Sequence, residues 1–474
     1  MSLAVVNDMP PEYFSDSTSE LFPLPIYSPS LQNANNLLYA PLCDSTAAGN
    51  WKYDFKHMGI DLGPRLWGVD RPVYGLNAKV QGTLRLFGSL ENVSEASVTF
   101  EGTMDLTTPE IGTRSSHDVI FLSRIVNFTS AEIQACSANQ NELSFSIPIP
   151  SQVEFQGATT QPPPTFCRYY YGFICLIRYS LKVCVVRHGL TKAVDLKAIP
   201  VLYFPKSRPS QPPLVEIARP PVHEDTLHTP DLHQSDRIRT YQLSAVYPKT
   251  YVGSRSQCKN TMFFSLPSPH CFTSGSKIPF LLSLVFPSDP ALGELYFNRI
   301  RISLLKRLTI CTQATGNRFK RLLTRRSSSK LGNTGASARS SPGPRDSPER
   351  SSSPETEHVV QVWQISDGHV KFKSEYSEGV CLYRGFIKTG DTGRECSWAL
   401  WSAIKVQYIL QVTVSAPSHL EDYLPDFELE EPIDLTTDTW ETEDRELRSM
   451  GGIPVPALGL LKTFDDAMTD TSVV

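Results

Sequence analysis

The most specific short binding motif in the sequence is Pro10-Pro11-Glu12-Tyr13. Two adjacent prolines hold a polyproline II turn whose rings fit between aromatic residues of a WW domain, and a tyrosine three positions after the first proline fills the neighbouring pocket. The motif lies in a stretch rich in Pro, Ser and Asn whose apolar residues follow no helix or strand period, which predicts an exposed arm. Pro10, Pro11 and Tyr13 are therefore predicted to bind a WW domain, and the alternative is a chance match.

A second group of candidate residues is a set of serines in a segment rich in Ser, Arg, Gly and Pro, from Thr312 to Glu357. A basic-directed kinase or proline-directed kinases could phosphorylate Ser327, Ser328, Ser341, Ser347 and Ser353. Each phosphate would add nearly two negative charges beside a basic stretch that runs from Arg299 to Arg326 and includes Lys306 and Arg307. The segment is thus either a charge switch or a solubilising linker, and the basic stretch either contacts anionic lipid or the acidic tail or is simply solvated.

Catalytic and metal-binding patterns are not found in the sequence. It has no phosphate loop, nucleophile elbow, paired-His zinc motif, calcium loop or dinucleotide glycine fingerprint. Its ten histidines have no spacing that would bring ligands together on a metal. We therefore predict no catalytic residue, no metal and no cofactor, although remote residues could still meet in the folded chain.

Composition narrows the class of protein. A net charge of -4 gives no general attraction to nucleic acid. The first residues lack the basic and apolar regions of a signal peptide, and no apolar run approaches the length of a membrane span, so a cytoplasmic chain is predicted. The ten cysteines are all single, with no CxxC pair, which favours reduced and mostly buried thiols.

Apolar residues alternate with polar ones in several segments, the period of a strand with one face on a core. From Leu76 to Leu86 the even positions are apolar or Gly and the odd positions are polar. The same pattern returns in the segments 96–100, 143–149, 173–185, 278–286, 300–304 and 404–414. Because no comparable stretch has the period of an amphipathic helix, the sheets must cover each other, which predicts an all-β chain of two tandem antiparallel β-sandwiches.

Prolines and charges place the boundaries. The prolines between Pro205 and Pro230 cannot sit in central strands, and the acidic residues past Pro432 predict a solvated tail. The predicted units are an arm (1–48), a first sandwich (49–215), a linker (216–238), a second sandwich (239–435) with a disordered insertion at about 312–357, and an acidic tail (436–474).

The order of several short motifs resembles the two domains of arrestin-like proteins. In the first half they are Phe145-Ser146-Ile147-Pro148-Ile149-Pro150, Pro162-Pro163-Pro164-Thr165-Phe166, Ile177-Arg178-Tyr179-Ser180-Leu181-Lys182-Val183 and Val201-Leu202-Tyr203-Phe204-Pro205. In the second half they are Phe272-Thr273-Ser274-Gly275-Ser276-Lys277-Ile278-Pro279-Phe280, Ile300-Arg301-Ile302, Val406-Gln407-Tyr408-Ile409-Leu410-Gln411-Val412 and Glu431-Pro432-Ile433-Asp434-Leu435. Together with the WW-binding tetrapeptide, this order is similar to the α-arrestin branch of that family, best known from fungi.

The resemblance implies a non-enzymatic adaptor. By that resemblance the sandwiches recognise cytosolic parts of membrane transporters or receptors, and the proline motif recruits a HECT-type ubiquitin ligase through its WW domains. The implied result is ubiquitination and endocytosis of the cargo by a cytoplasmic protein recruited to the plasma membrane or endosomes. Kinases and phosphoserine-binding proteins are further partners that the serine sites predict. The alternative is an arrestin-fold scaffold for signalling or sorting that uses no ubiquitin ligase.

Overall fold

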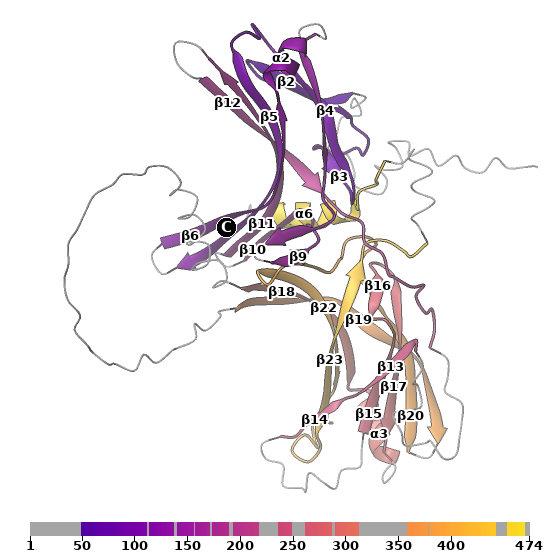
Figure 1. Ribbon diagram of the computed structural model, residues 1–474. Coiled ribbons are helices and arrows are strands. Elements are labelled where there is room, and N and C mark those ends of the chain that lie inside the picture. Colours follow the sequence, from indigo (N-terminus) through magenta and orange to yellow (C-terminus); the bar gives the residue numbers. More distant parts are fainter. Residues whose placement is uncertain are drawn as a thin grey trace, which may run out of the picture.

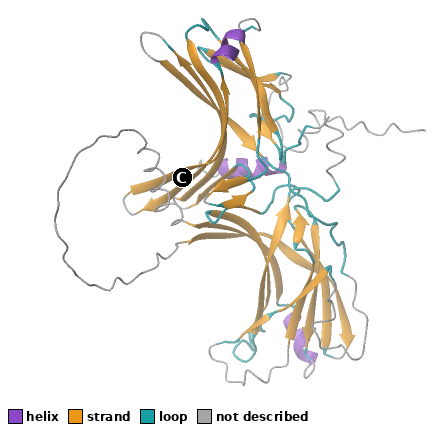
Figure 2. Cartoon of the chain, viewed as in Figure 1, coloured by secondary structure: helices purple, strands orange, loops and turns teal. Residues whose placement is uncertain are grey.

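The computed structural model describes residues 49–110, 113–136, 140–155, 157–170, 173–188, 193–217, 236–248, 261–286, 290–311, 358–377, 379–441 and 453–469. These residues form curled β-sheets packed as two sandwich-like halves, which confirms the predicted all-β fold (Figure 1). Helices are few and short beside the strands (Figure 2). Within the described residues, no strand before residue 204 pairs with a strand after residue 237.

The first half packs a four-stranded sheet against a six-stranded one. The order of the smaller sheet is β1 (Asn50–Asp54), β2 (Met58–Pro64), β4 (Lys79–Leu86) and β7 (Glu142–Pro148). The larger has the order β3 (Val73–Tyr74), β12 (Ala193–Tyr203), β11 (Phe173–Arg187), β5 (Val93–Glu110) and β6 (Thr113–Phe128), with β10 (Phe166–Tyr170) also paired to β11. A hairpin of β8 (Val153–Phe155) and β9 (Ala158–Thr160) and the helix α2 (Ser130–Ala135) complete this half.

The alternation seen in the sequence determines which face of each strand is buried. In β4, Val80 and Leu84 are fully buried, while Lys79 and Arg85 point to solvent. In β5 the register shifts at Gly102, where a Cβ would come within 2.7 Å of the Phe121 ring. Only glycine lets the strand bend here while an aromatic ring packs directly on its backbone.

The three-proline turn before β10 is fixed by hydrogen bonds to the core of the first half. The buried hydroxyl of Tyr179 donates to the carbonyl of Pro163 at 2.6 Å. The backbone of Thr165 donates to the carbonyl of Tyr203, and the Tyr203 amide donates back to the Thr165 hydroxyl at 2.9 Å. These bonds satisfy buried polar groups that would otherwise be costly, so the turn has a defined place in the core.

The second half is one eleven-stranded sheet that folds over on itself. Its order is β13 (Ile238–Gln242), β15 (Thr261–Pro267), β17 (Lys277–Val285), β20 (Val380–Lys388), β19 (His358–Ser377), β18 (Ile300–Cys311), β22 (Ile404–Val414), β23 (Asp426–Thr436) and β14 (Ser244–Val246). Two short strands pair at its side, β16 (Cys271–Thr273) with β23 and β21 (Trp398–Leu400) with β22, and the helix α3 (Pro290–Phe297) covers one end. Of all the described pairs only β3 with β12 and β16 with β23 are parallel.

The twenty-residue strand β19 makes the corner of this sheet. Its first part pairs with β18 up to Asp367, and its second part pairs with β20 from Gly368. A Cβ at Gly368 would lie 2.9 Å from the Cβ of Ile302, so glycine allows the two layers to approach where the strand passes from one to the other. One long strand thereby contributes to both layers of the sandwich.

Strand β17 is buried on both faces rather than on one. Leu281 and Val285 lie on the face away from the main core, where they form a second cluster with Ile217. Ile217 belongs to the segment that follows the first half, and it covers this outer face. The near-continuous apolar run in the sequence thus reflects coverage from both sides.

Beyond Pro432, Ile433 and Leu435 fall within the predicted second sandwich (239–435), whereas the prediction of a solvated tail (436–474) is wrong where apolar residues of that stretch are buried. Ile433 and Leu435 are buried within β23, because they alternate with acidic residues that face solvent. Farther on, Ala457 and Leu460 are buried beside the helix α6 (Gly459–Thr469). The many acidic residues around these apolar positions made the stretch look solvent-exposed in the sequence.

The state of the cysteines and the length of the helices can be compared with the sequence predictions. All eight described cysteines are free thiols, and six of them are buried, which confirms the predicted chemistry for these positions. Among the helices in the described part of the chain, none is long and apolar enough to cross a lipid bilayer.

Candidate functional site: the junction between the two sandwiches

The residues that the sequence predicts as a WW-domain ligand and as phosphorylation sites lie outside the described residues. This holds for Pro10, Pro11 and Tyr13 and for Ser327, Ser328, Ser341, Ser347 and Ser353. The structure does describe where the serine-bearing insertion begins and ends, because Cys311 of β18 pairs with His358 of β19. The insertion therefore connects two neighbouring positions at one end of a hairpin.

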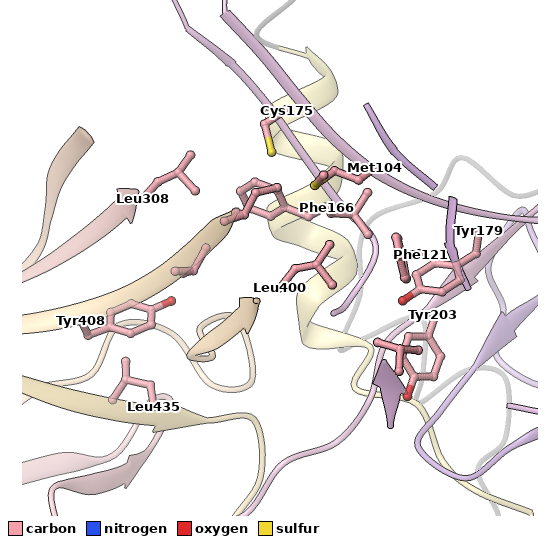
Figure 3. Packing of buried hydrophobic residues seen from close by; sticks show 14 of the residues in the cluster. Met104, Phe121, Phe166, Cys175, Tyr179, Tyr203, Leu308, Leu400, Tyr408 and Leu435 are labelled. Carbon is pink, nitrogen blue, oxygen red and sulfur yellow. The ribbon is translucent and has the colours of Figure 1, made fainter. Parts of the chain in front are cut away.

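Aromatic side chains carry the contact between the halves. Phe166 of β10 meets Trp398 of β21 edge to face, with ring centroids 5.1 Å apart. Phe121 of β6 meets Trp401 in the same way at 6.5 Å. Figure 3 shows buried side chains of both halves lining the two sides of this contact, with a helix between them. The two sandwiches thus share one continuous apolar cluster.

A buried ion pair lies next to this contact. The Lys306 ammonium of β18 is 2.6 Å from a carboxylate oxygen of Glu395, and only 4% of Lys306 is exposed. The hydroxyl of Tyr408 donates to the same oxygen at 2.5 Å, and burial followed by the nearby carboxylate raises the pKa of this phenol well above its usual value. A desolvated pair of this kind is stable only when its remaining hydrogen-bonding positions are satisfied. Here the Tyr408 hydroxyl fills one of these positions on the Glu395 carboxylate.

The ring of Trp363 on β19 extends the pair toward the first half. The Lys306 ammonium lies 5.6 Å from the centroid of this ring, and the Arg168 guanidinium of β10 lies 4.8 Å from it. A cation from each half therefore contacts one aromatic ring. The prediction that Lys306 contributes to an exposed basic stretch is wrong, since this lysine is buried and paired.

Helix α6 lies at the same place, between the two halves (Figure 1). The Thr463 hydroxyl donates to the Arg394 carbonyl at 3.0 Å, and Leu460 packs with Leu202 and Phe204 of the first half and with Cys396 of the second. A cavity of about 30 Å³, about the volume of one water molecule, remains between helix and sheets. Burial raises the pKa of the Cys167 thiol to about 11 and that of Cys396 to about 12, so both stay protonated near neutral pH and are poor nucleophiles.

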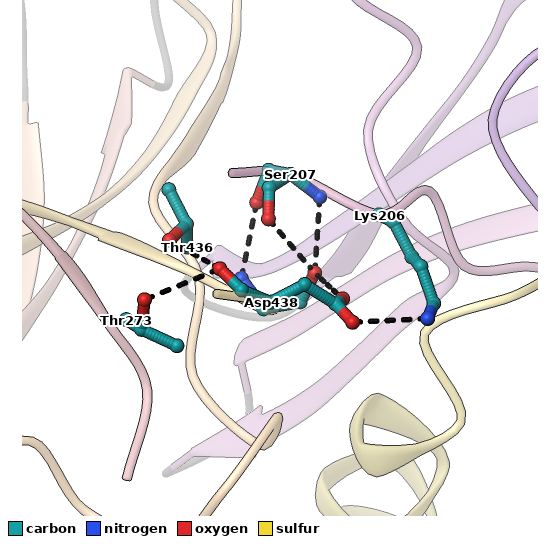
Figure 4. A network of polar contacts seen from close by, with 6 residues as sticks. Lys206, Ser207, Thr273, Thr436 and Asp438 are labelled. Atoms are coloured by element: carbon teal, nitrogen blue, oxygen red, sulfur yellow. Dashed lines mark hydrogen bonds and ion pairs between the residues drawn. The ribbon is translucent and has the colours of Figure 1, made fainter. Parts of the chain in front are cut away.

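A polar network joins the exits of β12 and β23 (Figure 4). The Lys206 ammonium lies 2.9 Å from a carboxylate oxygen of Asp438, and both side chains are largely shielded from solvent. The Ser207 amide donates to the Thr437 hydroxyl at 3.0 Å, and the Thr437 amide donates to the Ser207 hydroxyl at 3.2 Å. The Asp438 carbonyl accepts from Thr273 of β16 at 3.2 Å. This reciprocal network links residues that are some 230 positions apart in the chain.

These ion pairs and hydrogen bonds hold neighbouring segments of the chain in place, and they do not form a cluster of catalytic type. In the ranges the structure covers, no three His, Cys, Asp or Glu side chains gather as a metal site would require. Of the charged pairs at the junction, Lys206–Asp438 links the two halves, while Lys306–Glu395 lies within the second half. The arrangement therefore fixes how the two sandwiches sit relative to each other.

Sequence reasoning missed the junction residues. Glu395 and Asp438 lie in polar stretches, and nothing in their spacing marks them as largely shielded from solvent. Helix α6 did leave a signal, because Leu460, Leu461, Phe464 and Met468 follow helical spacing. That signal is short and stands next to an acidic run.

Comparison with known proteins adds no relative. No family model matches the chain. No curated protein matches it either.

Proposed function

We propose that this protein is an arrestin-like adaptor that recognises cytosolic parts of membrane transporters or receptors and recruits a WW-domain ubiquitin ligase of the HECT type. The observation that carries the proposal is the combination of two tandem β-sandwiches, joined through a buried junction, with the sequence motif Pro10-Pro11-Glu12-Tyr13. Sandwich surfaces suit protein recognition, and a proline–tyrosine ligand suits recruitment of a second protein.

The fold supports this proposal at the motifs on which the resemblance rests. The three-proline turn is hydrogen-bonded to Tyr179 and Tyr203, residues of two further motifs of the series. In the second half Val406, Tyr408 and Leu410 form the buried face of β22. Several residues that carry the resemblance are therefore core residues of the two sandwiches.

The paired charges of the junction also support an adaptor over an enzyme. A scaffold that holds cargo on one surface and a ligase on another gains from a fixed arrangement of its halves. The Lys206–Asp438 pair and the contact of Arg168 with the Trp363 ring link the two halves and support such an arrangement. Recruitment of the protein to the plasma membrane or endosomes would follow from its cargo.

The test is binding of the full-length chain to a panel of WW domains from HECT-type ligases, measured by fluorescence polarisation of the labelled domains. We expect micromolar dissociation constants for the natural chain and at least tenfold weaker binding for Tyr13→Ala, because the tyrosine pocket is left empty. Tyr39→Ala is the matched control, since Tyr39 lies in the same arm and none of the three residues before it is proline.

Two results would count against the proposal. Equal binding by the Tyr13→Ala chain would show that the motif is not the ligand. No binding to any WW domain would favour the ligase-independent scaffold, which the presence of only one complete copy of the motif already allows.

A further inference from the structure

An open groove lies on the first half, next to the strands β2 and β3. Its volume is about 390 Å³, and aromatic and aliphatic side chains line it, among them Trp51, Leu66, Trp67 and Tyr74. Leu66 is 37% exposed, so the rim offers an apolar contact that the described residues leave open to solvent. Grooves lined by Trp and Tyr are the surfaces that extended, proline-containing peptides recognise.

One end of the groove is already formed by a segment of that kind. Ile453 and Pro454 line it, and the chain continues as Val455 and Pro456 against Gly75, the residue that follows β3. A Cβ at Gly75 would lie only 2.9 Å from the Val455 carbonyl oxygen, so this segment packs directly on the backbone of the sheet. The surface therefore accepts an apolar–Pro–aliphatic–Pro sequence in close contact.

The same sequence pattern occurs twice more, in Ile147-Pro148-Ile149-Pro150, where Ile147 and Ile149 are buried in the first half, and in the N-terminal arm. Phe22-Pro23-Leu24-Pro25 matches Ile453-Pro454-Val455-Pro456 position by position in chemical type. Prolines at alternate positions keep a peptide extended before it binds, so little conformational entropy is lost on docking.

The arm also leaves the fold beside the groove. The Arg65 amide donates to the Gly49 carbonyl at 3.0 Å, and Arg65 stands between Pro64 and Leu66, which both line the groove. Roughly 25 residues separate Pro25 from this point, and a chain of that length with random-coil dimensions would span roughly 27 Å. A tether of this length gives an effective concentration on the order of 1 mM.

Charge favours the same occupant. Residues 1–48 contain no Lys, Arg or His, and their charged side chains are Asp8, Glu12, Asp16, Glu20 and Asp44. Lys79 lines the groove and is exposed, and Arg65 lies at its edge, where its guanidinium is 4.4 Å from the Trp51 ring centroid. Glu20 precedes the proline segment by two positions and would approach these cations.

We propose that this groove is an intramolecular docking site for Phe22-Pro23-Leu24-Pro25 of the chain's own arm. Docking there leaves Pro10 to Tyr13 outside the groove, nine residues ahead of Phe22. The arm is then held against the first sandwich at one point while its tip stays accessible. The inference does not depend on the ligase proposal.

The first test measures competition by the arm. A fluorescent peptide of residues 19–31 is titrated with the full-length natural chain and with a full-length variant in which Phe22, Pro23, Leu24 and Pro25 are all replaced by Ala. We expect the variant to bind the peptide at least tenfold more tightly, because its groove is no longer filled by its own arm. Equal affinity for the two chains, or no binding to the variant, would overturn the assignment.

Two further variants locate the site. In the four-Ala background, Leu66→Asp should weaken peptide binding at least tenfold, because it places a carboxylate on the apolar rim. Leu196→Asp is the matched control, since Leu196 is an exposed leucine on β12, which contributes no residue to the groove. If both substitutions have the same effect, the peptide does not bind in the groove.

A photo-crosslinking amino acid at position 22 of the full-length chain tests the occupant directly. Cross-links within one chain to the segment 62–81 are expected, at a yield that does not change on dilution. Cross-linked dimers that disappear on dilution would instead assign the groove to the arm of a second copy. Cross-links mapped elsewhere would also overturn the proposal.

Discussion

Lys306 illustrates how much depends on single charges at the junction. Its ammonium is almost entirely removed from water and is balanced by Glu395. Lys306→Met should leave that carboxylate buried without a cation and lower the free energy of unfolding by about 3–5 kcal/mol. The measurement is a urea titration followed by circular dichroism.

The second half of this experiment separates the charge from the packing. The double variant Lys306→Met/Glu395→Gln should recover most of the loss, because it removes both charges and Gln can still accept from Tyr408. Lys373→Met is the control, since Lys373 pairs with the half-exposed Glu294 and such a pair contributes less than about 1 kcal/mol. A double variant as unstable as the single one would show that the charge balance is unimportant.

The elements show which parts of the fold could be predicted from sequence. Strands with one buried face, such as β4 and β22, were predictable because a period of two is a local signal. The insertion of Ile217 over β17 was not predictable, since it depends on a contact between segments far apart in the chain. The buried acid Glu395 was hidden for the same reason, because its partner lies 89 positions away.

Helix α6 is the element for which sequence composition was most misleading. Leu460 is 7% exposed and contacts both halves. Leu460→Ala should cost about 2–5 kcal/mol in the attachment of the helix. We expect faster hydrogen–deuterium exchange of the backbone amides in residues 457–469. Exchange in β4 should stay unchanged.

The control for this prediction uses the same substitution on an exposed helix face. Leu295 of α3 is 41% exposed, so Leu295→Ala should leave exchange in α3 nearly unchanged. If Leu460→Ala leaves exchange in α6 equally unchanged, the helix is not held by its apolar side chains.

At the scale of the whole molecule, three kinds of contact hold the halves together: aromatic pairs, the contact of Arg168 with the Trp363 ring, and the Lys206–Asp438 network. The last of these lies where the chain leaves each sandwich, so it restrains rotation of one half against the other. The apolar contacts alone would not fix the angle between the halves, because the hydrophobic effect is not directional. The polar network is therefore expected to determine the angle between the halves.

Asp438→Asn tests this expectation with almost no change in shape. The substitution removes the carboxylate charge that lies 2.9 Å from the Lys206 ammonium while keeping the hydrogen bonds between Ser207 and Thr437 possible. We expect at least tenfold faster amide exchange in residues 204–209 and 434–441 and a larger radius of gyration by small-angle X-ray scattering. Asp391→Asn is the matched control, because Asp391 is 60% exposed in its contacts with Lys388 and Arg394, and removing it should change neither quantity. An Asp438→Asn chain with unchanged exchange and scattering would mean that the aromatic contacts and α6 are enough to hold the two sandwiches at a fixed angle.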